Sequence, residues 1–470
     1  MGMLMLAAVL EKAGFNVHLL DANAARNSKS TEEIIQFSRK LKPDLVGMTL
    51  LTPMVREAYK LALGLQGNGA KLLAGGPHAT LLPEEPLHHG FDAVVVGEGE
   101  PTIVEAAQVL LGIIPKETVK GLVYLDSNGR PVHTKSRPEL TNLDDLPLPA
   151  RHLVNPLDYG PDNGEIHSNL FSSRGCPGRC SYCAGHLFGK KFRFRSAGNV
   201  LDEMVKVHKA YETKHFHFVD DAITMDKGRL KEICQGLIEA DMSVTWSVMT
   251  RVDQVNEELL ALMARAGCVR IDYGVESGHP ETLKRIHKSH TVEMVRRTIP
   301  LTAKFGIRPY VFFIFGFPWE TPDDIEKTHK LLIELAPYVD KFQPAIASIL
   351  IPFPGTEIYE KYKEKYGFEE WWLSEDRNYD APDALGHPYY QSVIYRNGAV
   401  LDADFFHYST ELREKIYEAF KFMYWHSLRG SNMVARWVRV FALDVSKRLH
   451  YFSPSFEHAV FNVIPKTRRQ

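Results

Sequence analysis

The chain has 470 residues, which is long enough for two to four domains. Its 44% hydrophobic and 24% charged residues are the proportions of an ordinary globular protein. A formal net charge of −2 gives no indication of nucleic-acid binding. With five cysteines, no recognisable signal peptide and no apolar run long enough to cross a bilayer, we expect a cytoplasmic protein without a disulfide framework.

The first third of the chain alternates helical stretches with short apolar strands. We expect helices at 3–13, about 31–41 and about 53–66, and strands at 17–21, 44–50, 71–76 and 93–100. Gly14 ends the first helix as a C-cap. This alternation predicts a parallel, doubly wound sheet, and ligands of such sheets bind at the carboxyl ends of the strands.

Three turns follow these strands, at Thr49–Thr52, Gly75–Thr80 and Gly97–Glu100. Glycines in such turns allow the backbone to approach a bulky ligand closely. They also occur in α/β sheets for purely structural reasons, so each turn alone is weak evidence for a binding site.

Residues 118–167 are expected to form a connector. The Asn128-Gly129 pair lies between two apolar runs and predicts a β-hairpin. The proline-rich stretch 143–151 predicts a linker, which we interpret as a spacer between two domains.

Three of the five cysteines, Cys176, Cys180 and Cys183, lie within eight positions. Gly175 and Gly178 loosen this short loop, which allows three thiolates to face one point. Three thiolates suit an iron–sulfur cluster, and with no fourth cysteine nearby one iron is left open for another ligand. The alternative is a structural zinc site, for which His186 is the nearby fourth ligand.

The cysteine spacing, with Tyr182 just before the third cysteine, resembles the radical S-adenosylmethionine (SAM) superfamily. This resemblance implies a [4Fe–4S] cluster whose open iron is chelated by SAM. One electron, from a donor such as ferredoxin or flavodoxin, then cleaves SAM to a 5′-deoxyadenosyl radical that abstracts a hydrogen atom. The cofactors supply the difficult chemistry, and the protein supplies position and exclusion of water.

The three N-terminal turns resemble the cobalamin-binding domain that precedes many radical SAM cores. The resemblance implies that cobalamin contacts Thr49, Thr52, Gly75, Gly76, His78, Thr80, Gly97, Glu98, Gly99 and Glu100. The Asp-x-His-x-x-Gly signature is absent, which implies a lower cobalt face without a protein ligand. The strand that precedes the first helix in that family, normally central in the sheet, is also missing. An alternative is therefore a radical SAM enzyme whose N-terminal domain is empty.

From Asn169 onward the chain repeats a strand–helix pattern. The expected strands are at 168–174, 214–220, 243–249, 269–276, 307–315 and 342–351. Six such units predict an incomplete (β/α) barrel of six strands, with its active site at the C-terminal ends of the strands. By resemblance, the residues that contact SAM are Tyr182, Asp220 or Asp221, Arg251, Glu276 and Gly316.

Structural alternatives remain for several of these residues. Asp220 and Asp221 are placed to cap the following helix, and Arg251 is placed to pair with Asp253. Cys234 and Cys268 are expected to be buried structural residues. His215 and His217 alternate with phenylalanines on a strand, so we expect them to face a helix or solvent.

The last hundred residues, 371–470, are expected to be mostly helical. Residues 421–470 carry nine Lys or Arg and two Asp or Glu, with an apolar stripe from Val434 to Leu449. A basic amphipathic helix of this kind either lies on an anionic membrane surface, which would suit a lipid-like substrate, or packs on the barrel. The aromatic pairs Trp371-Trp372 and Tyr389-Tyr390 are expected to cover the barrel mouth.

The sequence therefore predicts an α/β protein with a Rossmann-like cobalamin domain at 1–117, a connector at 118–167, a radical SAM barrel at 168–370 and a helical segment at 371–470. The predicted function is C-methylation of a small-molecule or lipid-like substrate. Alternatives are oxidative cyclisation or rearrangement with the same cofactors, as in anaerobic tetrapyrrole ring formation, and a non-catalytic cobalamin or iron–sulfur protein.

Overall fold

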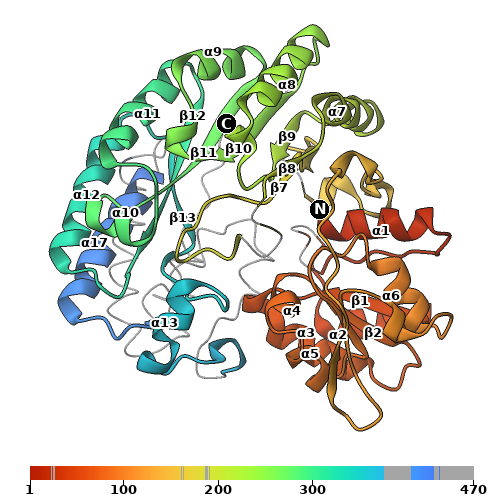
Figure 1. Ribbon diagram of the computed structural model, residues 1–470. Helices are drawn as coiled ribbons and strands as arrows, with labels where there is room; N and C mark the ends of the chain where they lie inside the picture. The colour runs from red at the N-terminus through yellow and green to blue at the C-terminus, as the bar shows by residue number, and fades with distance from the viewer. Residues whose placement is uncertain are drawn as a thin grey trace.

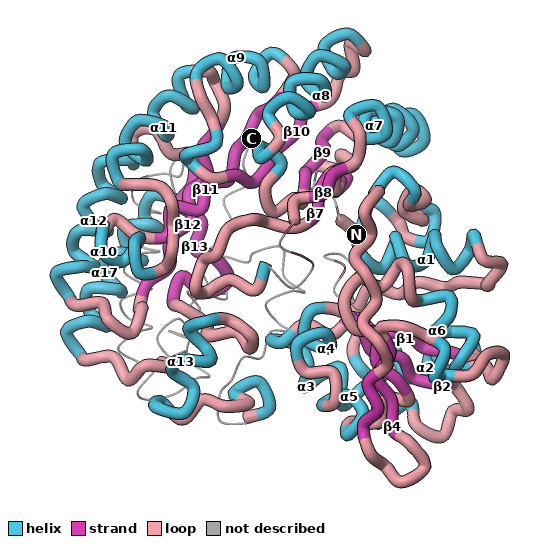
Figure 2. The backbone as a smooth tube through the Cα atoms, viewed as in Figure 1, coloured by secondary structure: helices cyan, strands magenta, loops and turns pink. Residues whose placement is uncertain are grey.

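The computed structural model describes residues 1–22, 24, 27–159, 161, 163–185, 189, 191–374, 404–427 and 433. Two α/β units are visible in Figure 1, one at the N-terminus and a larger one that follows it. In Figure 2 the strands of the larger unit form an arc with helices along its outer side.

The N-terminal sheet has five strands in sequential order. They are β1 (Leu45–Thr49), β2 (Lys71–Gly75), β3 (Ala93–Val95), β4 (Leu122–Leu125) and β5 (Pro131–His133). The first three are parallel, and β4 and β5 are antiparallel. The hairpin expected in the connector is therefore part of this sheet, because β4 pairs directly with β3.

Six helices belong to this unit: α1 (Gly2–Lys12), α2 (Thr31–Leu41), α3 (Val55–Leu65), α4 (Pro77–Leu81), α5 (Glu85–His88) and α6 (Ile103–Leu110). Local sequence explains where α2 begins. The Ser30 hydroxyl accepts a hydrogen bond from the Glu33 amide, and the Glu33 carboxylate accepts one from the Ser30 amide. This reciprocal capping box satisfies two amides that the first turn of a helix leaves unpaired.

The prediction of a strand at 17–21 is wrong. Residues 15–20 adopt no regular secondary structure, and β1 is the edge of the sheet. Residues 16–22 and β1 both line one cavity. A strand needs a neighbour for its backbone hydrogen bonds, and Val17–Asp21 has none among the described strands.

The second sheet has six parallel strands in the order β13-β12-β11-β10-β9-β6. Their bounds are β6 (His167–Leu170), β9 (His215–Phe218), β10 (Thr245–Thr250), β11 (Cys268–Glu276), β12 (Arg308–Phe315) and β13 (Lys341–Ile349). Side chains alternate between two faces: Phe216 and Phe218 are fully buried, and His215 and His217 are part-buried on the other face. Cys234 and Cys268 are buried, as expected.

The helices of this unit are α7 (Ala197–Tyr211), α8 (Lys227–Glu239), α9 (Glu257–Arg265), α10 (Pro280–Arg285), α11 (Val292–Lys304), α12 (Pro322–Leu335), α13 (Glu357–Tyr366) and α17 (Thr410–Ser427). A two-stranded antiparallel ribbon, β7 (Ser173–Arg174) and β8 (Arg193–Phe194), stands apart from the main sheet. It encloses the loop that carries the three clustered cysteines.

The C-terminal part is described only to Ser427, apart from Met433. The apolar stripe of 434–449 and the pair Tyr389-Tyr390 lie outside the described residues. Trp371 and Trp372 are buried, and the Trp372 indole donates to Glu85 of α5, 3.0 Å from Oε2. This pair therefore joins the barrel to the N-terminal unit. Within the described residues, no helix has both the length and the apolar composition that a membrane crossing requires.

Candidate cofactor sites

The loop of residues 175–192 carries Cys176, Cys180 and Cys183, and the β7–β8 ribbon closes its base. Gly175 has φ of +81°, and a Cβ there would lie 2.4 Å from the Lys191 carbonyl oxygen. Only glycine allows the two ends of the loop to approach this closely. A Cβ on Gly178 would lie 3.3 Å from Cys176 Sγ and 3.9 Å from Cys180 Sγ, so both sulfurs lie close around this glycine.

None of the five cysteines forms a disulfide. Cys183 is exposed, and Cys176 and Cys180 are part-buried. His186, the fourth ligand of the zinc alternative, lies outside the described residues. Three free thiols on one loop suit a soft metal centre with one open coordination position.

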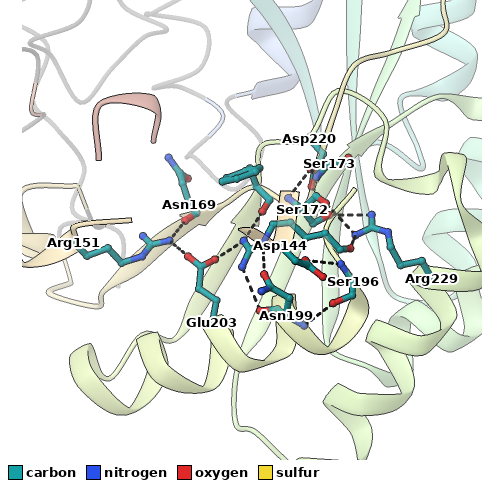
Figure 3. Close-up of polar contacts among 12 residues, drawn as sticks. Asp144, Arg151, Asn169, Ser172, Ser173, Ser196, Asn199, Glu203, Asp220 and Arg229 are labelled. Atoms are coloured by element: carbon teal, nitrogen blue, oxygen red, sulfur yellow. Dashed lines mark hydrogen bonds and ion pairs between the residues drawn. The ribbon is translucent and has the colours of Figure 1, made fainter. Parts of the chain in front are cut away.

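Asp220 supports the residues that lead into this loop. It is buried at the end of β9 and accepts hydrogen bonds from the Ser172 amide (2.7 Å), the Ser172 hydroxyl (3.0 Å), and the amide and hydroxyl of Ser173. Figure 3 shows Asp220 above the two serines. Both of its oxygens thus have partners. Asp221 is exposed and lines the large cavity described below.

Neither aspartate caps the next helix. Asp226 is the N-cap of α8, and its side chain accepts from the Arg229 amide. The capping alternative for Asp220 and Asp221 is therefore wrong. Of the two, Asp221 is the one left available to a ligand.

A second part of the same network surrounds Glu203 on α7, which is fully buried. Its carboxylate pairs with Arg151 at 2.9 Å and with Arg195 at 2.5 Å. Arg195 also donates to the Phe171 carbonyl (2.9 Å). Figure 3 shows Arg151 and Glu203 side by side next to Asn169 of β6. The connector, α7 and the strand before the cluster loop are therefore held by one buried carboxylate.

Glu276, Tyr182 and Lys288 form a buried polar group at the end of β11. The Tyr182 hydroxyl donates to Glu276 Oε1 at 2.8 Å, and Lys288 Nζ lies 3.0 Å from the same oxygen. Burial alone would lower the pKa of Lys288, but the neighbouring Glu276 carboxylate raises it above its usual value. Glu276 has φ of +68°, a region that non-glycine residues rarely adopt. Strain of this kind is concentrated at functional sites.

Arg251 lies beside the cluster loop at the end of β10. Its Nη1 is 3.8 Å from the position of a Cβ on Gly178. It also forms a bidentate pair with Asp253, with nitrogen–oxygen distances of 2.9 and 2.7 Å. The predicted pairing with Asp253 is therefore confirmed, and the predicted contact of Arg251 with SAM stays a prediction for a guanidinium that lies next to the cysteines.

Gly316, expected to contact SAM, has partners within the chain. Its amide donates to Glu320 Oε2 at 2.9 Å, and its carbonyl accepts from the Tyr408 hydroxyl at 2.6 Å. A Cβ at Gly316 would lie 2.4 Å from that hydroxyl. Close packing of Tyr408 therefore requires glycine here, whether or not a ligand is bound.

A cavity of about 1340 Å³ lies between the N-terminal unit and the barrel. Seven of the ten residues predicted to contact cobalamin line it: Thr49, Gly75, Gly76, Gly97, Glu98, Gly99 and Glu100. From the barrel side it is lined by Asn169, Val219 and Asp221, and by Arg174 and Gly175 at the start of the cluster loop. The cavity thus connects the two predicted cofactor regions.

Thr52, His78 and Thr80 do not line this cavity. His78 is fully buried, with its ring nitrogens 3.1 Å from the Thr52 hydroxyl and 2.9 Å from Glu85 Oε1. Thr80 accepts a hydrogen bond from the Gly97 amide at 3.1 Å and so connects two of the turns. These three residues support the cavity wall from behind, and His78 has no nitrogen left for a metal.

Glu98 and Glu100 are buried and paired with arginines of the ribbon. Burial would raise the pKa of Glu98. Hydrogen bonds from Arg193, from the Leu140 amide and from Arg174 outweigh that effect and hold its pKa below the usual range. Glu98 therefore stays ionised on a wall of the cavity.

Fold and site together define an enzyme that combines a three-cysteine metal loop on a parallel barrel with a separate α/β ligand-binding domain. Residues 170–332 match the model of the radical SAM superfamily, and residues 1–107 match that of the B12 binding domain. The chain belongs to the radical SAM enzymes that carry a B12-binding domain, and its cofactors are a [4Fe–4S] cluster, SAM and cobalamin.

Two methyltransferases are among its relatives. An uncharacterized methyltransferase of Pyrococcus horikoshii is 33% identical over 334 residues, which are 70% of this chain and 71% of the relative. Cytidylyl-2-hydroxyethylphosphonate methyltransferase of Streptomyces wedmorensis is 30% identical over 368 residues, 68% of this chain and 69% of the relative. The anaerobic magnesium-protoporphyrin IX monomethyl ester cyclase of Rubrivivax gelatinosus is 28% identical over 374 residues, 77% of this chain and 66% of the relative.

Two solved structures share the fold. The radical SAM methyltransferase TsrM from Kitasatospora setae aligns with a TM-score of 0.64 and 20% identity, covering 78% of this chain and 72% of its own. The cobalamin-dependent radical SAM enzyme OxsB aligns with a TM-score of 0.66 and 16% identity, covering 99% of this chain and 79% of its own.

The residues present fit these cofactors. Three thiols on one glycine-containing loop provide the donors that an iron–sulfur cluster needs. On the cavity wall, Gly97 has φ of +85° and open space where a side chain would project. Glycine at this position keeps the cavity free for a large planar ligand.

Sequence reasoning missed Lys288, Glu320 and Tyr408. A signal for Lys288 exists: a carboxylate at the end of an apolar strand needs a partner, and Lys288 is a cation in the segment after the next helix, α10. Tyr408 is far from Gly316 in the sequence, and no local pattern connects the two.

Proposed function

We propose that this enzyme methylates an unactivated carbon of a small-molecule substrate. The observation that carries the proposal is the cavity that joins the cobalamin-contact turns to the base of the cluster loop. When bound, SAM and the reduced cluster supply a hydrogen-abstracting radical, and cobalamin supplies the methyl group. The cavity runs from the cobalamin-contact turns to Arg174 and Gly175 at the base of the cluster loop, so a substrate held there lies next to both regions.

In this proposal, Cys176, Cys180 and Cys183 hold the cluster, and Glu276 with Tyr182 binds the ribose of SAM. Asp221 faces the cavity and is the candidate partner for the SAM ammonium group. Lys288 fixes the orientation of Glu276, since the two are 3.0 Å apart. The buried contacts among Glu276, Tyr182 and Lys288 hold these three side chains in place before SAM binds, which favours binding because little order remains to be imposed.

Thr49, Gly75, Gly76, Gly97 and Gly99 form the wall that faces cobalamin in this proposal, while Thr52, His78 and Thr80 support it. We place the cobalamin domain at 1–117 together with the β4–β5 hairpin that completes its sheet. The rest of the stretch up to 167 is the connector, and the core barrel is at 168–370. The electron comes from a reductant such as ferredoxin or flavodoxin.

Oxidative cyclisation with the same cofactors is the second candidate. It is favoured by the cyclase of Rubrivivax gelatinosus, whose match extends over 77% of this chain, compared with 70% for the Pyrococcus horikoshii methyltransferase. The two reactions differ in what they do to SAM. A methyltransferase produces S-adenosylhomocysteine as well as 5′-deoxyadenosine, whereas a cyclase that transfers no methyl group produces only the latter.

The test uses the full chain, reconstituted anaerobically with iron, sulfide and hydroxocobalamin, and incubated with reductant, deuteromethyl-labelled SAM and a metabolite extract of the host cell. Both nucleoside products and a metabolite carrying the deuterated methyl group are expected. Formation of 5′-deoxyadenosine without S-adenosylhomocysteine would reject methylation in favour of the second candidate, oxidative cyclisation. Cys180→Ala is the control, in which the visible absorbance of the cluster and all deoxyadenosine formation should be lost.

A further inference from the structure

Two arginines stand opposite each other at the base of the cluster loop. Arg174 on β7 is the register partner of Arg193 on β8 in the antiparallel ribbon. Arg174 is separated from Cys176 by one residue, Gly175, whose close contact with the Lys191 carbonyl keeps the ribbon narrow. Any displacement of these arginines therefore moves the start and the end of the cluster loop together.

Both arginines bind carboxylates of the N-terminal unit. Glu98 accepts from Arg174 Nη1 at 3.1 Å and from Arg193 Nη1 at 2.9 Å. Glu100 accepts from both terminal nitrogens of Arg174. We call these four residues the Glu–Arg bridge. The two glutamates belong to the turn after β3, and the arginines belong to the cluster ribbon, 74 to 95 positions further along the chain.

The bridge is shielded from water, which makes it rigid. Glu98, Glu100 and Arg193 are each less than 10% exposed. The Leu140 backbone completes it, since its amide donates to Glu98 and its carbonyl accepts from Arg193 at 2.8 Å. Buried ion pairs with satisfied hydrogen bonds hold one geometry, because moving one partner leaves the other charge buried without compensation.

The same turn is part of the wall of the large cavity. Gly97, Glu98, Gly99 and Glu100 line it, as do Arg174 and Gly175. A ligand that fills the cavity therefore fixes the position of the carboxylates, and the carboxylates fix the arginines. The contacts form one continuous path from the cavity wall to the residue before the first cysteine.

We propose that the Glu–Arg bridge is a positioning device that couples cobalamin binding to the formation of the iron–sulfur site. Cobalamin in the cavity orders the turn, which holds the ribbon in the geometry that brings the cysteines together. Linkage requires that the effect is reciprocal, so cluster loading strengthens cobalamin binding by the same factor. This inference rests on the proposed placement of cobalamin in the cavity.

The experiment measures cobalamin affinity of the full chain in two states, cluster-free and cluster-loaded. Hydroxocobalamin is titrated and the free corrin is separated by ultrafiltration. We expect the cluster-loaded form to bind at least about 5-fold more tightly, the lower end of typical allosteric coupling. In the double variant Glu98→Gln with Glu100→Gln, that ratio should fall to about one, because neutral amides no longer hold the arginines.

The ratio of the two cobalamin affinities distinguishes a positioning role of the glutamates from a direct contact with cobalamin. Loss of a direct contact weakens binding equally in both states and leaves the ratio unchanged. Glu105→Gln is the matched control, since Glu105 lies five positions after Glu100 and also pairs with an arginine, Arg137. The ratio of this control should equal that of the wild type. Arg174→Lys, which keeps the charge but not the fork, should give an intermediate ratio.

Three outcomes overturn the proposal. A wild type that binds cobalamin with the same affinity in both states has no coupling, and the bridge is then structural only. A double variant that keeps the wild-type ratio assigns the coupling to other residues. A wild type that binds no hydroxocobalamin in either state rejects the placement of cobalamin itself, and with it both proposals.

Discussion

Glu276 adopts a left-handed backbone conformation, which costs a non-glycine residue about 1–3 kcal/mol. The side chains around it hold this conformation. Lys288 and Tyr182 both contact its Oε1 atom, and the neighbouring Gly274 has no Cβ because one would lie 2.5 Å from that oxygen. A strained, paired carboxylate at the C-terminal end of a barrel strand is typical of a ligand contact.

Replacing Glu276 by Gln tests this role. We expect SAM to bind about 10- to 100-fold more weakly, because a hydrogen bond to a charged group contributes about 1.5–3 kcal/mol. Equilibrium dialysis of labelled SAM with cluster-loaded protein measures this affinity. The iron content of the variant should equal that of the wild type. Glu281→Gln is the control, since Glu281 is half-exposed on the helix that follows. Unchanged SAM affinity in Glu276→Gln would remove this residue from the site.

Glu320 leads to a prediction about how the stability of the protein depends on pH. Burial raises its pKa to about 8, although hydrogen bonds from the Phe317 and Gly316 amides oppose the shift. The folded chain then holds a proton that the unfolded chain releases near its usual pKa of 4.5. The free energy of unfolding should therefore fall as the pH rises from about 5 to 8, by up to about 1.4 kcal/mol per pH unit from this group.

Urea unfolding at several pH values measures the effect, with Glu320→Gln as comparison. The amide does not titrate, so the variant should show a smaller decline of stability over this window. Identical slopes in both proteins would mean that Glu320 is ionised in the folded state.

Most expected helices and strands agree with the structure, but the strand expected at 93–100 ends at Val95, and the strand expected at 168–174 is divided between β6 and β7. The strand expected at 269–276 forms all but the first residue of β11, and the helix expected at about 31–41 is α2. Val17–Asp21 has the pattern of a strand but pairs with none of the strands that the structure describes, and a local pattern carries no information about a partner. The hairpin at Asn128-Gly129 was predicted, but its membership of the first sheet depends on a pairing with β3 that no local signal encodes.

The buried network around Glu203 on α7 leads to a prediction about stability. Glu203→Ala leaves Arg151 and Arg195 without their shared carboxylate, and breaking a buried pair in this way costs about 3–5 kcal/mol. Urea unfolding should show this loss. Asp202→Ala, at the neighbouring exposed position of the same helix, should change stability by less than about 0.5 kcal/mol. Equal effects of the two substitutions would mean that the network contributes little.

For the whole molecule, the sequence located the cluster cysteines and most of the turns on the cavity wall. It did not reveal how the two halves meet. The contacts of Glu98 with Arg193 and of Trp372 with Glu85 join residues that are 95 and 287 positions apart. Neither residue of these pairs stands in a pattern that points to the other. Glu98 and Glu100, which were predicted to contact cobalamin, are therefore also residues that connect the two units.

A large side chain placed in the cavity should block cobalamin binding while the cluster and SAM sites still form. Thr49 is exposed at the end of β1 and lines the cavity. A tryptophan there places a large ring in the space that we assign to cobalamin, so Thr49→Trp should lower hydroxocobalamin affinity at least about 10-fold. The cluster and SAM sites should still form, because Cys176, Tyr182 and Glu276 do not line this cavity. Loss of the coupling proposed above should weaken them only by the factor of that coupling, about 5-fold at its lower end. Thr141→Trp, at an exposed threonine outside the cavity, is the control. Retention of corrin absorbance by Thr49→Trp after gel filtration would place cobalamin elsewhere, whereas loss of both cofactors would show that the two sites cannot form independently.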